Sequence, residues 1–346
     1  MKRILLTIFQ AAVTILLLWW IFRDPQKNQQ MLEALRKSQW LWLVPGVLSI
    51  GVACLLQTWR WGLLLRVQGI DFGWIRTLRV YMIGLFFNLF MLGATGGDVV
   101  KIYYAMRETS SRKEAAFLSV LVDRMMGLLG LVAITALFVG LRWTELTAHP
   151  VTRGLLGVLG GVMGAMLGLV VFGFFVDRFG LAGRLPKWLP LHARIVEFAS
   201  AFSVYARDGR VLLSTFALSA VCHIFNFLAF YFAARALGAF LGWNGLVDVF
   251  SVMPIILTIS ALPISLAGMG VREGLFEKMF AELFGKGSAA YAIAVPMSLL
   301  GFFMTVFWGV VGGVVYFLYR PSGGLHLAEM QKEIASVEHS IEDRAG

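Results

Sequence analysis

A glycine-rich turn followed by a charged helix start is the segment of this sequence best suited to binding an anion. Residues 96–101 have the sequence GGDVVK. Gly96 and Gly97 allow a tight chain reversal, and Asp98 and Lys101 then lie one turn apart on the same helical face. The free N–H groups and positive dipole end of such a helix suit phosphate. The alternative is an ordinary interfacial turn with a capping aspartate and a lysine that extends to the membrane surface.

A second segment, nearer the C-terminus, combines the same features. Residues 263–274 have the sequence PISLAGMGVREG. Gly268 and Gly270 precede a predicted helix start, which carries Arg272 and Glu273 in its first turn. Two such breaks in opposite halves of a membrane protein are what an inverted repeat would produce, and broken helices of this kind often mark a transport site.

Two adjacent charges, Asp123 and Arg124, occur a few residues inside an apolar run. Charged groups at that depth are costly and usually face a protein interior or a water-filled cavity. Local pairing of these two side chains with each other, with the arginine extending to the membrane surface, is the alternative interpretation. The sequence therefore adds both residues to the candidate site.

Other polar residues in the apolar runs carry weaker signals. A lone histidine in an apolar helix more often serves packing than ligand binding, so we expect His223 to be structural. Arg60 and Arg235 lie near enough to span ends to reach the membrane surface as anchors. No catalytic motif, His/Cys cluster or Walker motif is visible in the sequence, so we predict no catalytic residue, metal or cofactor. Three further polar residues are weaker candidates: Asn88, Asn226 and Asp248.

Membrane helices are the elements that must position these groups. The chain has 346 residues, of which 59% are hydrophobic and 14% charged, against about 25% charged residues in ordinary globular proteins. Several apolar runs reach the roughly 20 residues that cross a bilayer core. The longest polar segment, 177–210, is too short for a separate catalytic domain. The net charge of +10 falls in loops between spans, so it indicates cytoplasmic loops and not nucleic-acid binding.

The sequence predicts an all-α integral membrane protein with about six full transmembrane helices and two re-entrant helical hairpins. The predicted spans are 4–22, 41–65, 117–141, 154–176, 211–237 and 289–318. The stretch 81–92 has basic residues on both flanks, so we expect it to enter and leave on the cytoplasmic side. The stretch 246–284, broken by prolines and glycines, would enter and leave on the outer side, completing an inverted-repeat-like arrangement. Eight full spans is the alternative.

The charge distribution also predicts location. Residues 1–320 should form one polytopic domain in the plasma (inner) membrane, and 321–346 a polar cytoplasmic tail, with both termini in the cytoplasm. Glycines recur at three- and four-residue spacing between Gly157 and Gly168. This pattern permits close helix packing and leaves a homodimer open.

Three blocks of the sequence resemble the lysylphosphatidylglycerol synthase transmembrane-region family, also called the flippase-like or AglD-like domain. They are Asn88 with GGDVVKIYY over 96–104, DRMMG over 123–127 and LPISLAGMGVREG over 262–274. The resemblance extends over about 4–319. The family usually has arginine where this sequence has Lys101, which binds phosphate as a point charge and not as a bidentate clamp.

The resemblance implies a lipid flippase that moves a phosphate-containing polar lipid, a phospholipid or a polyprenyl phosphate, between leaflets. Cations of the three blocks would neutralise the phosphate, and the neighbouring carboxylates would hold those cations. The implied substrate-binding residues are Asn88, Gly96, Gly97, Asp98, Lys101, Asp123, Arg124, Gly268, Gly270, Arg272 and Glu273. We expect no fused synthase or glycosyltransferase and hence no enzyme. A scaffold for a separately encoded transferase and a membrane-embedded lipid transferase remain as alternatives.

Overall fold

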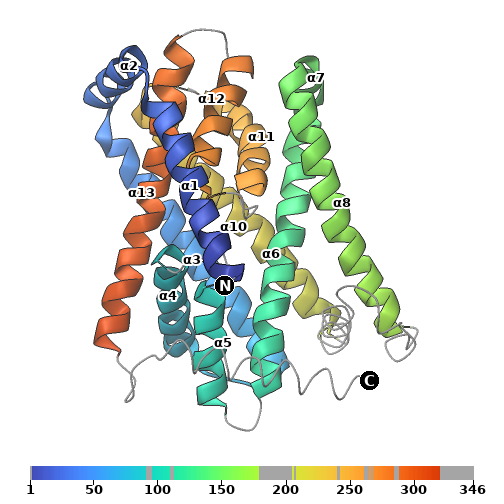
Figure 1. Cartoon of the computed structure of the whole chain (residues 1–346). Helices are drawn as coiled ribbons and strands as arrows, with labels where there is room; N and C mark the ends of the chain where they lie inside the picture. Colours follow the sequence, from blue (N-terminus) through green and yellow to red (C-terminus); the bar gives the residue numbers. More distant parts are fainter. Residues whose placement is uncertain are drawn as a thin grey trace.

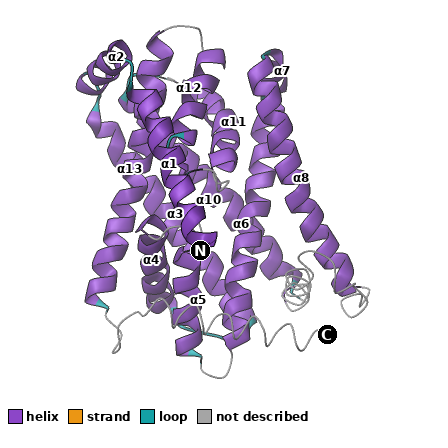
Figure 2. Cartoon of the chain, in the orientation of Figure 1, coloured by secondary structure: helices purple, strands orange, loops and turns teal. Residues whose placement is uncertain are grey.

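The fold consists of helices throughout the part of the chain that the structure describes. The computed structural model describes residues 2–90, 96–109, 113–178, 205, 208–239, 242–260, 265, 268–283 and 288–319. These ranges contain 12 α-helices, one 3-10 turn and no strand (Figure 2). The all-α prediction is therefore confirmed for them. The predicted tail 321–346 and most of the segment 177–210 lie outside the described residues.

Five described helices are long and apolar enough to cross a membrane. They lie in η1 (Trp40–Trp42) with α3 (Leu43–Val67), α6 (Lys113–Leu141), α10 (Gly209–Ala236), α11 (Gly242–Ser260) and α13 (Ser288–Leu318). Four of them coincide with predicted spans. The fifth, α11, is the first half of the stretch that the sequence predicts to re-enter.

The other two predicted spans are also helices. Helix α1 (Lys2–Phe22) has 21 residues and coincides with the predicted span 4–22. Helix α8 (Pro150–Arg178) has 29 residues and begins with a proline, whose missing N–H has no partner to lose at a first helical position. Two short helices, α2 (Pro25–Arg36) and α7 (Trp143–Ala148), precede α3 and α8 in the chain.

Two pairs of shorter helices occupy opposite ends of the bundle (Figure 1). Helices α4 (Trp74–Phe90) and α5 (Gly96–Glu108) lie in the lower part of that view, and α11 and α12 (Val271–Leu283) lie in the upper part. Helix α13 contacts a member of each pair, α4 and α12. Helices α5 and α12 begin at the two glycine-rich breaks, as the sequence predicts.

Close packing through glycine fixes α4 against α13. A Cβ atom added at Gly312 would lie 2.1 Å from the Met82 carbonyl oxygen, and one at Gly309 would lie 1.8 Å from Leu89 Cδ1. Small residues let helix backbones approach this closely in membranes. The glycines of α8 differ, because an added Cβ at Gly157 or Gly168 would meet nothing within 4 Å. The homodimer suggested by their spacing stays a prediction.

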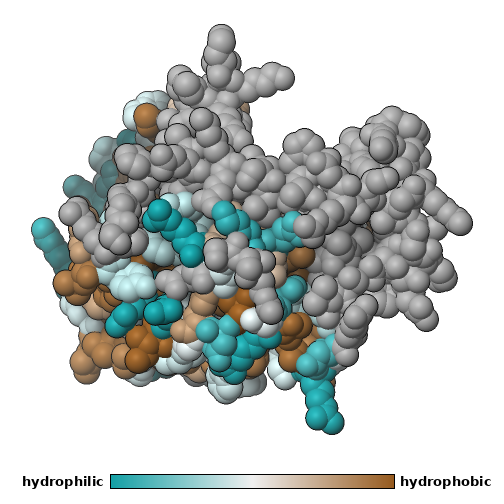
Figure 3. Space-filling view, turned by 90° about the horizontal axis from the view of Figure 1, so that it is seen from below, coloured by the Kyte–Doolittle hydropathy of each residue, from teal (hydrophilic) through white to brown (hydrophobic). Residues whose placement is uncertain are grey.

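The largest hydrophobic cluster of the described residues is centred on α10, α11, α12 and α13. Two pairs of buried aromatic rings pack there: Phe227 lies against Phe250, and Phe276 is stacked on Phe280. Seen from below, hydrophilic and hydrophobic described residues are intermixed on the visible part of this bundle end (Figure 3). A second hydrophobic cluster packs α3, α4, α5 and α6 together at the other end of the bundle.

Candidate functional site

A cavity of about 290 Å³ lies between α3, α4, α5, α6 and α10. Its charged lining residues are Arg60 on α3, Asp98 and Lys101 on α5, and Asp123 and Arg124 on α6. We refer to these five side chains as the charge cluster. Four of them were predicted from the sequence as site residues, and the fold brings those four together from two helices.

The charge cluster is a chain of alternating signs. Asp123 accepts from Arg60 Nε at Oδ1 (2.7 Å) and from Lys101 Nζ at Oδ2 (3.3 Å). Asp98 Oδ1 lies 3.8 Å from the same Lys101 Nζ. The other oxygen of Asp98, Oδ2, pairs with Arg124 Nε. All four carboxylate oxygens therefore face a cation, and three cations against two carboxylates leave the cluster with one excess positive charge.

Burial divides the charge cluster into an inner part and an open end. Arg60 and Lys101 are each 5% exposed, and Asp123 is 3% exposed. Removing such ions from water costs several kcal/mol each unless they are paired, so the inner part forms one electrostatic unit. In contrast, the side chain of Arg124 is 43% exposed. An anion entering from the membrane or from water would therefore meet Arg124 first.

The role of Arg60 was missed by sequence reasoning. The prediction that it reaches the membrane surface is wrong, because its guanidinium is buried and also donates to Ser219 Oγ on α10 at 2.8 Å. Arg60 lies seven residues before the end of α3, which is about 10 Å at 1.5 Å per residue. From there a long side chain can reach either the membrane surface or a neighbouring helix. Gln57 lies almost one turn earlier on the same helix. A second polar residue at that spacing is the sequence signal that could have indicated a polar helix face at Arg60.

Adjacent residues Asp123 and Arg124 bind different partners. Successive side chains on an α-helix point about 100° apart. Asp123 is therefore directed to Arg60, while Arg124 is directed to Asp98 on α5. Local pairing, the alternative that the sequence left open, does not occur. Both residues instead connect α6 to neighbouring helices.

Aromatic rings enclose the lysine at the centre of the cluster. The Nζ of Lys101 lies 5.1 Å from the ring centroids of both Trp61 and Tyr81. Cation–π contacts of this kind stabilise a desolvated ammonium. The aliphatic part of Lys101 packs on α4, since a Cβ added at Gly84 would lie 2.8 Å from Lys101 Cγ. Lys101 is thus fixed in position before any ligand binds.

The start of α5 is held by α4. The N–H of Gly97 donates to Asn88 Oδ1 at 2.8 Å. Asn88 is therefore the acceptor at this helix start, while Asp98 pairs with cations. A Cβ added at Gly97 would lie 2.1 Å from the Gly84 carbonyl oxygen. Gly97 is therefore a point of close backbone approach between α4 and α5. Gly96, also predicted for the site, is the first residue of α5.

Two further uncharged polar residues, Gln57 and His223, line the cavity. Gln57 Nε2 donates to the Ala53 carbonyl oxygen at 3.2 Å. His223 Nε2 lies 2.9 Å from the Gly127 carbonyl oxygen. A carbonyl oxygen can only accept, so this ring nitrogen carries the hydrogen. The contact fits the expected structural role of His223, and the residue also lines the cavity.

The second glycine-rich break forms a self-contained buried group. Arg272 donates from Nε and Nη2 to Glu273 Oε1, at 3.0 and 2.7 Å. Ser298 on α13 also donates to that oxygen, and the Gly270 N–H donates to Glu273 Oε2 at 2.7 Å. This last bond is half of a capping box, which covers the start of α12. Arg272 and Glu273 are only 7% and 1% exposed. The structure brings these two predicted site residues together, but neither lines the charge cluster's cavity.

Backbone shape and unpaired hydroxyls mark the same break. Gly268 and Gly270 have φ of +73° and +81°, which glycine adopts without strain. A Cβ at Gly268 would lie 2.7 Å from the Ser260 carbonyl oxygen, at the end of α11. The buried hydroxyls of Thr258, Ser260 and Ser265 have no hydrogen-bond partner. A Cβ at Gly270 would lie 2.6 Å from Leu17 Cβ, so both glycines are points of close packing, which is consistent with a structural use.

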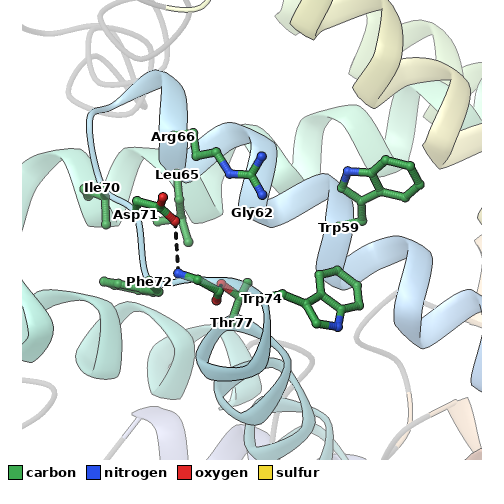
Figure 4. A pocket seen from close by; sticks show the side chains of 10 residues that line it. Trp59, Gly62, Leu65, Arg66, Ile70, Asp71, Phe72, Trp74 and Thr77 are labelled. Carbon is green, nitrogen blue, oxygen red and sulfur yellow. Dashed lines mark hydrogen bonds between the residues drawn. The ribbon is translucent and has the colours of Figure 1, made fainter.

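Two other cavities differ from the charged one in size and charge. The first, at the α3–α4 turn, holds about 10 Å³, which is room for one water molecule. There, Asp71 Oδ1 accepts from the Gly73 N–H at 2.9 Å, and Trp59 and Trp74 stand to one side (Figure 4). This turn closes the lower end of α3 and is too small for a lipid headgroup.

Another cavity, of about 370 Å³, lies beside α7 and α11. Arg142 Nη2 pairs there with Asp248 Oδ1 at 2.9 Å, and Arg142 Nη1 lies 3.2 Å from Glu145 Oε1. On the short helix α7, the pKa of Glu145 lies below its usual value because the carboxylate accepts hydrogen bonds from its own backbone N–H and from Thr144, with Arg142 adding a smaller effect. With one cation and two carboxylates, this group of side chains carries one excess negative charge, whereas the charge cluster carries one excess positive charge.

Comparison with known proteins places almost the whole chain in one family. The sequence model described as "Lysylphosphatidylglycerol synthase TM region" matches residues 7–309. A UPF0104 membrane protein of Pyrococcus horikoshii is 22% identical over 337 residues, covering 91% of this chain and 96% of the relative. A UPF0104 membrane protein of Methanothermobacter thermautotrophicus is 22% identical over 317 residues, covering 82% and 88%.

Proposed function

Since this chain belongs to the lysylphosphatidylglycerol synthase TM region family and is a multi-pass membrane protein, we propose that it transports lipids. It would bind a phosphate-containing headgroup in the charge cluster's cavity and move it between leaflets while the acyl or prenyl chains stay in the bilayer. The observation that carries this proposal is the excess positive charge of the cluster, which ends at the half-exposed Arg124. The chain itself would perform no covalent chemistry.

Phosphate binding would use the outer half of the cluster. Arg124 and Lys101 both contact Asp98, so an entering phosphate competes with one carboxylate for two cations. Guanidinium–phosphate hydrogen bonds are charge-assisted and directional, whereas the lysine contributes a point charge. Asp98 keeps both cations in place while the cavity is empty of ligand. The inner pair, Arg60 and Asp123, stays intact and holds α3 against α6.

The broken helix pairs would provide the path. We propose that α4 and α5 re-enter from the cytoplasmic side and α11 and α12 from the outer side of the plasma (inner) membrane, with both termini in the cytoplasm. Backbone that is not helical is tolerated at membrane depth only where it is buried in protein or lines a cavity. The location of the two pairs at opposite ends of the bundle supports this arrangement (Figure 1).

Accessibility labelling tests the topology. In a background of Cys54→Ala and Cys222→Ala, we expect cysteines introduced at Asp71 and Arg107 to react only with a membrane-permeant maleimide in intact cells. A cysteine at Thr144 on α7 should react with an impermeant reagent as well. All three positions are exposed. Labelling of position 107 by the impermeant reagent would mean that α5 crosses to the outer side, and re-entry would be wrong.

The Arg124→Gln substitution tests the phosphate site. We expect it to reduce phospholipid transport in liposomes by at least about tenfold, because a charge-assisted contact contributes about 1.5–3 kcal/mol. Arg124→Lys should retain part of the rate. Because Arg124 is half-exposed, the thermal unfolding temperature of both variants should stay near wild type. Arg153→Gln, an exposed arginine on α8, is the matched control and should transport normally.

Two results would contradict the transport proposal. Unchanged transport in Arg124→Gln would remove the phosphate role of the cluster. If the wild-type protein moved no lipid in liposomes but co-purified with a soluble transferase, a scaffold would be the better description. The identity of lipids retained by the purified protein, determined by mass spectrometry, would distinguish these outcomes in one preparation.

A further inference from the structure

Among the described residues that line the charge cluster's cavity, no carboxylate is left unpaired to bind an amine. Its lining carboxylates among the described residues are Asp98 and Asp123. Asp123 is shared between Arg60 and Lys101, and Asp98 between Lys101 and Arg124. A ligand ammonium would therefore have to displace a cation from a paired carboxylate, next to a cluster that is already positive in sum. Both effects disfavour a cationic headgroup.

The uncharged lining residues have hydrogen-bonding capacity left over. Asn88 accepts at Oδ1 from Gly97, so the two N–H donors of its Nδ2 remain for a ligand. Gln57 donates from Nε2 to Ala53, so its Oε1 remains as an acceptor. In the neutral imidazole of His223, whose Nε2–H contacts the Gly127 carbonyl, Nδ1 remains as a second acceptor.

This set of donors and acceptors matches hydroxyl groups, which both donate and accept. A phosphate at Arg124 and Lys101 would leave the rest of the headgroup facing Asn88, Gln57 and His223, because all five residues line the same cavity. The volume of about 290 Å³ is at the lower end of ordinary ligand pockets, about 300–1,000 Å³. It suits a headgroup and not a whole lipid.

We propose that the cavity selects lipids whose phosphate carries an uncharged, hydroxyl-bearing group, a glycerol or a sugar, over lipids whose phosphate carries an amine. This selectivity rests on the proposed function, because it assumes that the phosphate binds at the cluster. Asn88 and Gln57 are the specificity-determining residues. Glycerol and sugar share the same chemistry here, and the choice of probes separates them.

Binding of short-chain lipids to the full-length protein in detergent tests the selectivity. The probes are the dihexanoyl forms of phosphatidylglycerol, phosphatidylinositol, phosphatidylmethanol and phosphatidylethanolamine. Phosphatidylmethanol has the same charge as phosphatidylglycerol but no hydroxyl, so this pair isolates hydroxyl recognition. We expect phosphatidylglycerol or phosphatidylinositol to bind about tenfold tighter than phosphatidylmethanol, as one or two net hydrogen bonds would give. Phosphatidylethanolamine should bind more weakly than all three.

Substitution at Gln57 connects the preference to the cavity. Gln57→Leu should bring the phosphatidylglycerol and phosphatidylmethanol affinities to within about twofold, with phosphatidylmethanol binding unchanged. The matched control is Gln29→Leu, an exposed glutamine on α2, which should keep the wild-type ratio. The phosphatidylinositol arm decides between the two polyols, since a sugar-selective cavity prefers it to phosphatidylglycerol.

The failures of the two proposals are distinguishable. Equal binding of all four lipids, or tighter binding of phosphatidylethanolamine, would overturn the headgroup selectivity and leave the phosphate site standing. An unchanged ratio in Gln57→Leu would also overturn it. Binding of none of the probes would instead contradict the proposed phosphate site itself.

Discussion

Replacing Asp123 with alanine should lower the free energy of unfolding by about 3–5 kcal/mol, because removing one partner leaves buried charges uncompensated. The carboxylate is 3% exposed and is shared by Arg60 and Lys101, each 5% exposed. Lys101 keeps a more distant contact with Asp98, but among the described residues Arg60 keeps only its hydrogen bond to the Ser219 hydroxyl. Unfolding in mixed micelles, with increasing sodium dodecyl sulfate, measures the change.

A matched ion pair and a double substitution make this result specific. Asp248→Ala removes one of the two acidic partners of Arg142, and that arginine side chain is 26% exposed and keeps Glu145, so the loss should stay at about 1 kcal/mol. Arg60→Gln combined with Asp123→Asn removes the buried Arg60–Asp123 pair and leaves Lys101 its contact with Asp98, so it should recover part of the stability. A loss in Asp123→Ala no larger than in Asp248→Ala would show that the cluster is not a buried electrostatic unit.

Replacing Gly97 with alanine should destabilise the protein by about 1–3 kcal/mol, although glycine to alanine in a helix is normally favourable. The added Cβ would lie 2.1 Å from the Gly84 carbonyl oxygen and 2.5 Å from Asn88 Cγ. A backbone oxygen cannot rotate away, so α5 has to move off α4. We expect the shift to displace Asp98 and Lys101 and to abolish lipid retention together with the loss of stability.

Gly140→Ala on α6 is the control with the opposite sign. An added Cβ there meets nothing within 4 Å, so the substitution should raise stability by about 0.5–1 kcal/mol through the lower entropy of the unfolded chain. Both variants are compared by the same detergent titration, and lipid retention is followed by mass spectrometry. If Gly97→Ala were as stable as Gly140→Ala, close approach of α4 and α5 would not be what this glycine provides.

The sequence alone determined the fold class and the main helix boundaries. Apolar length, low charge and the absence of polar segments long enough for a second domain predict a helical membrane bundle, and these are properties of local composition. The starts of α5 and α12 were also predictable. Gly97 and Gly270 mark positions where only a residue without a side chain permits the close approach or the positive φ found there.

Only the tertiary structure decided which charges meet. The pattern placed Asp98, Lys101, Asp123 and Arg124 in one site, but it did not reveal that Arg60 on α3 completes the cluster. A side chain near a span end can reach either the membrane surface or a neighbouring helix, and sequence spacing describes one helix at a time.

The two glycine-rich breaks look alike in sequence and differ in the fold, because the sequence does not show which helix each one packs against. Arg272 is neutralised by its own neighbour Glu273 and also donates to the Ser298 hydroxyl, because the start of α12 packs against α13 and excludes water there. Arg124 points across to another helix and remains half-exposed beside a cavity. The rotation of each helix and the identity of its neighbours set these outcomes, and both depend on packing between segments far apart in the chain.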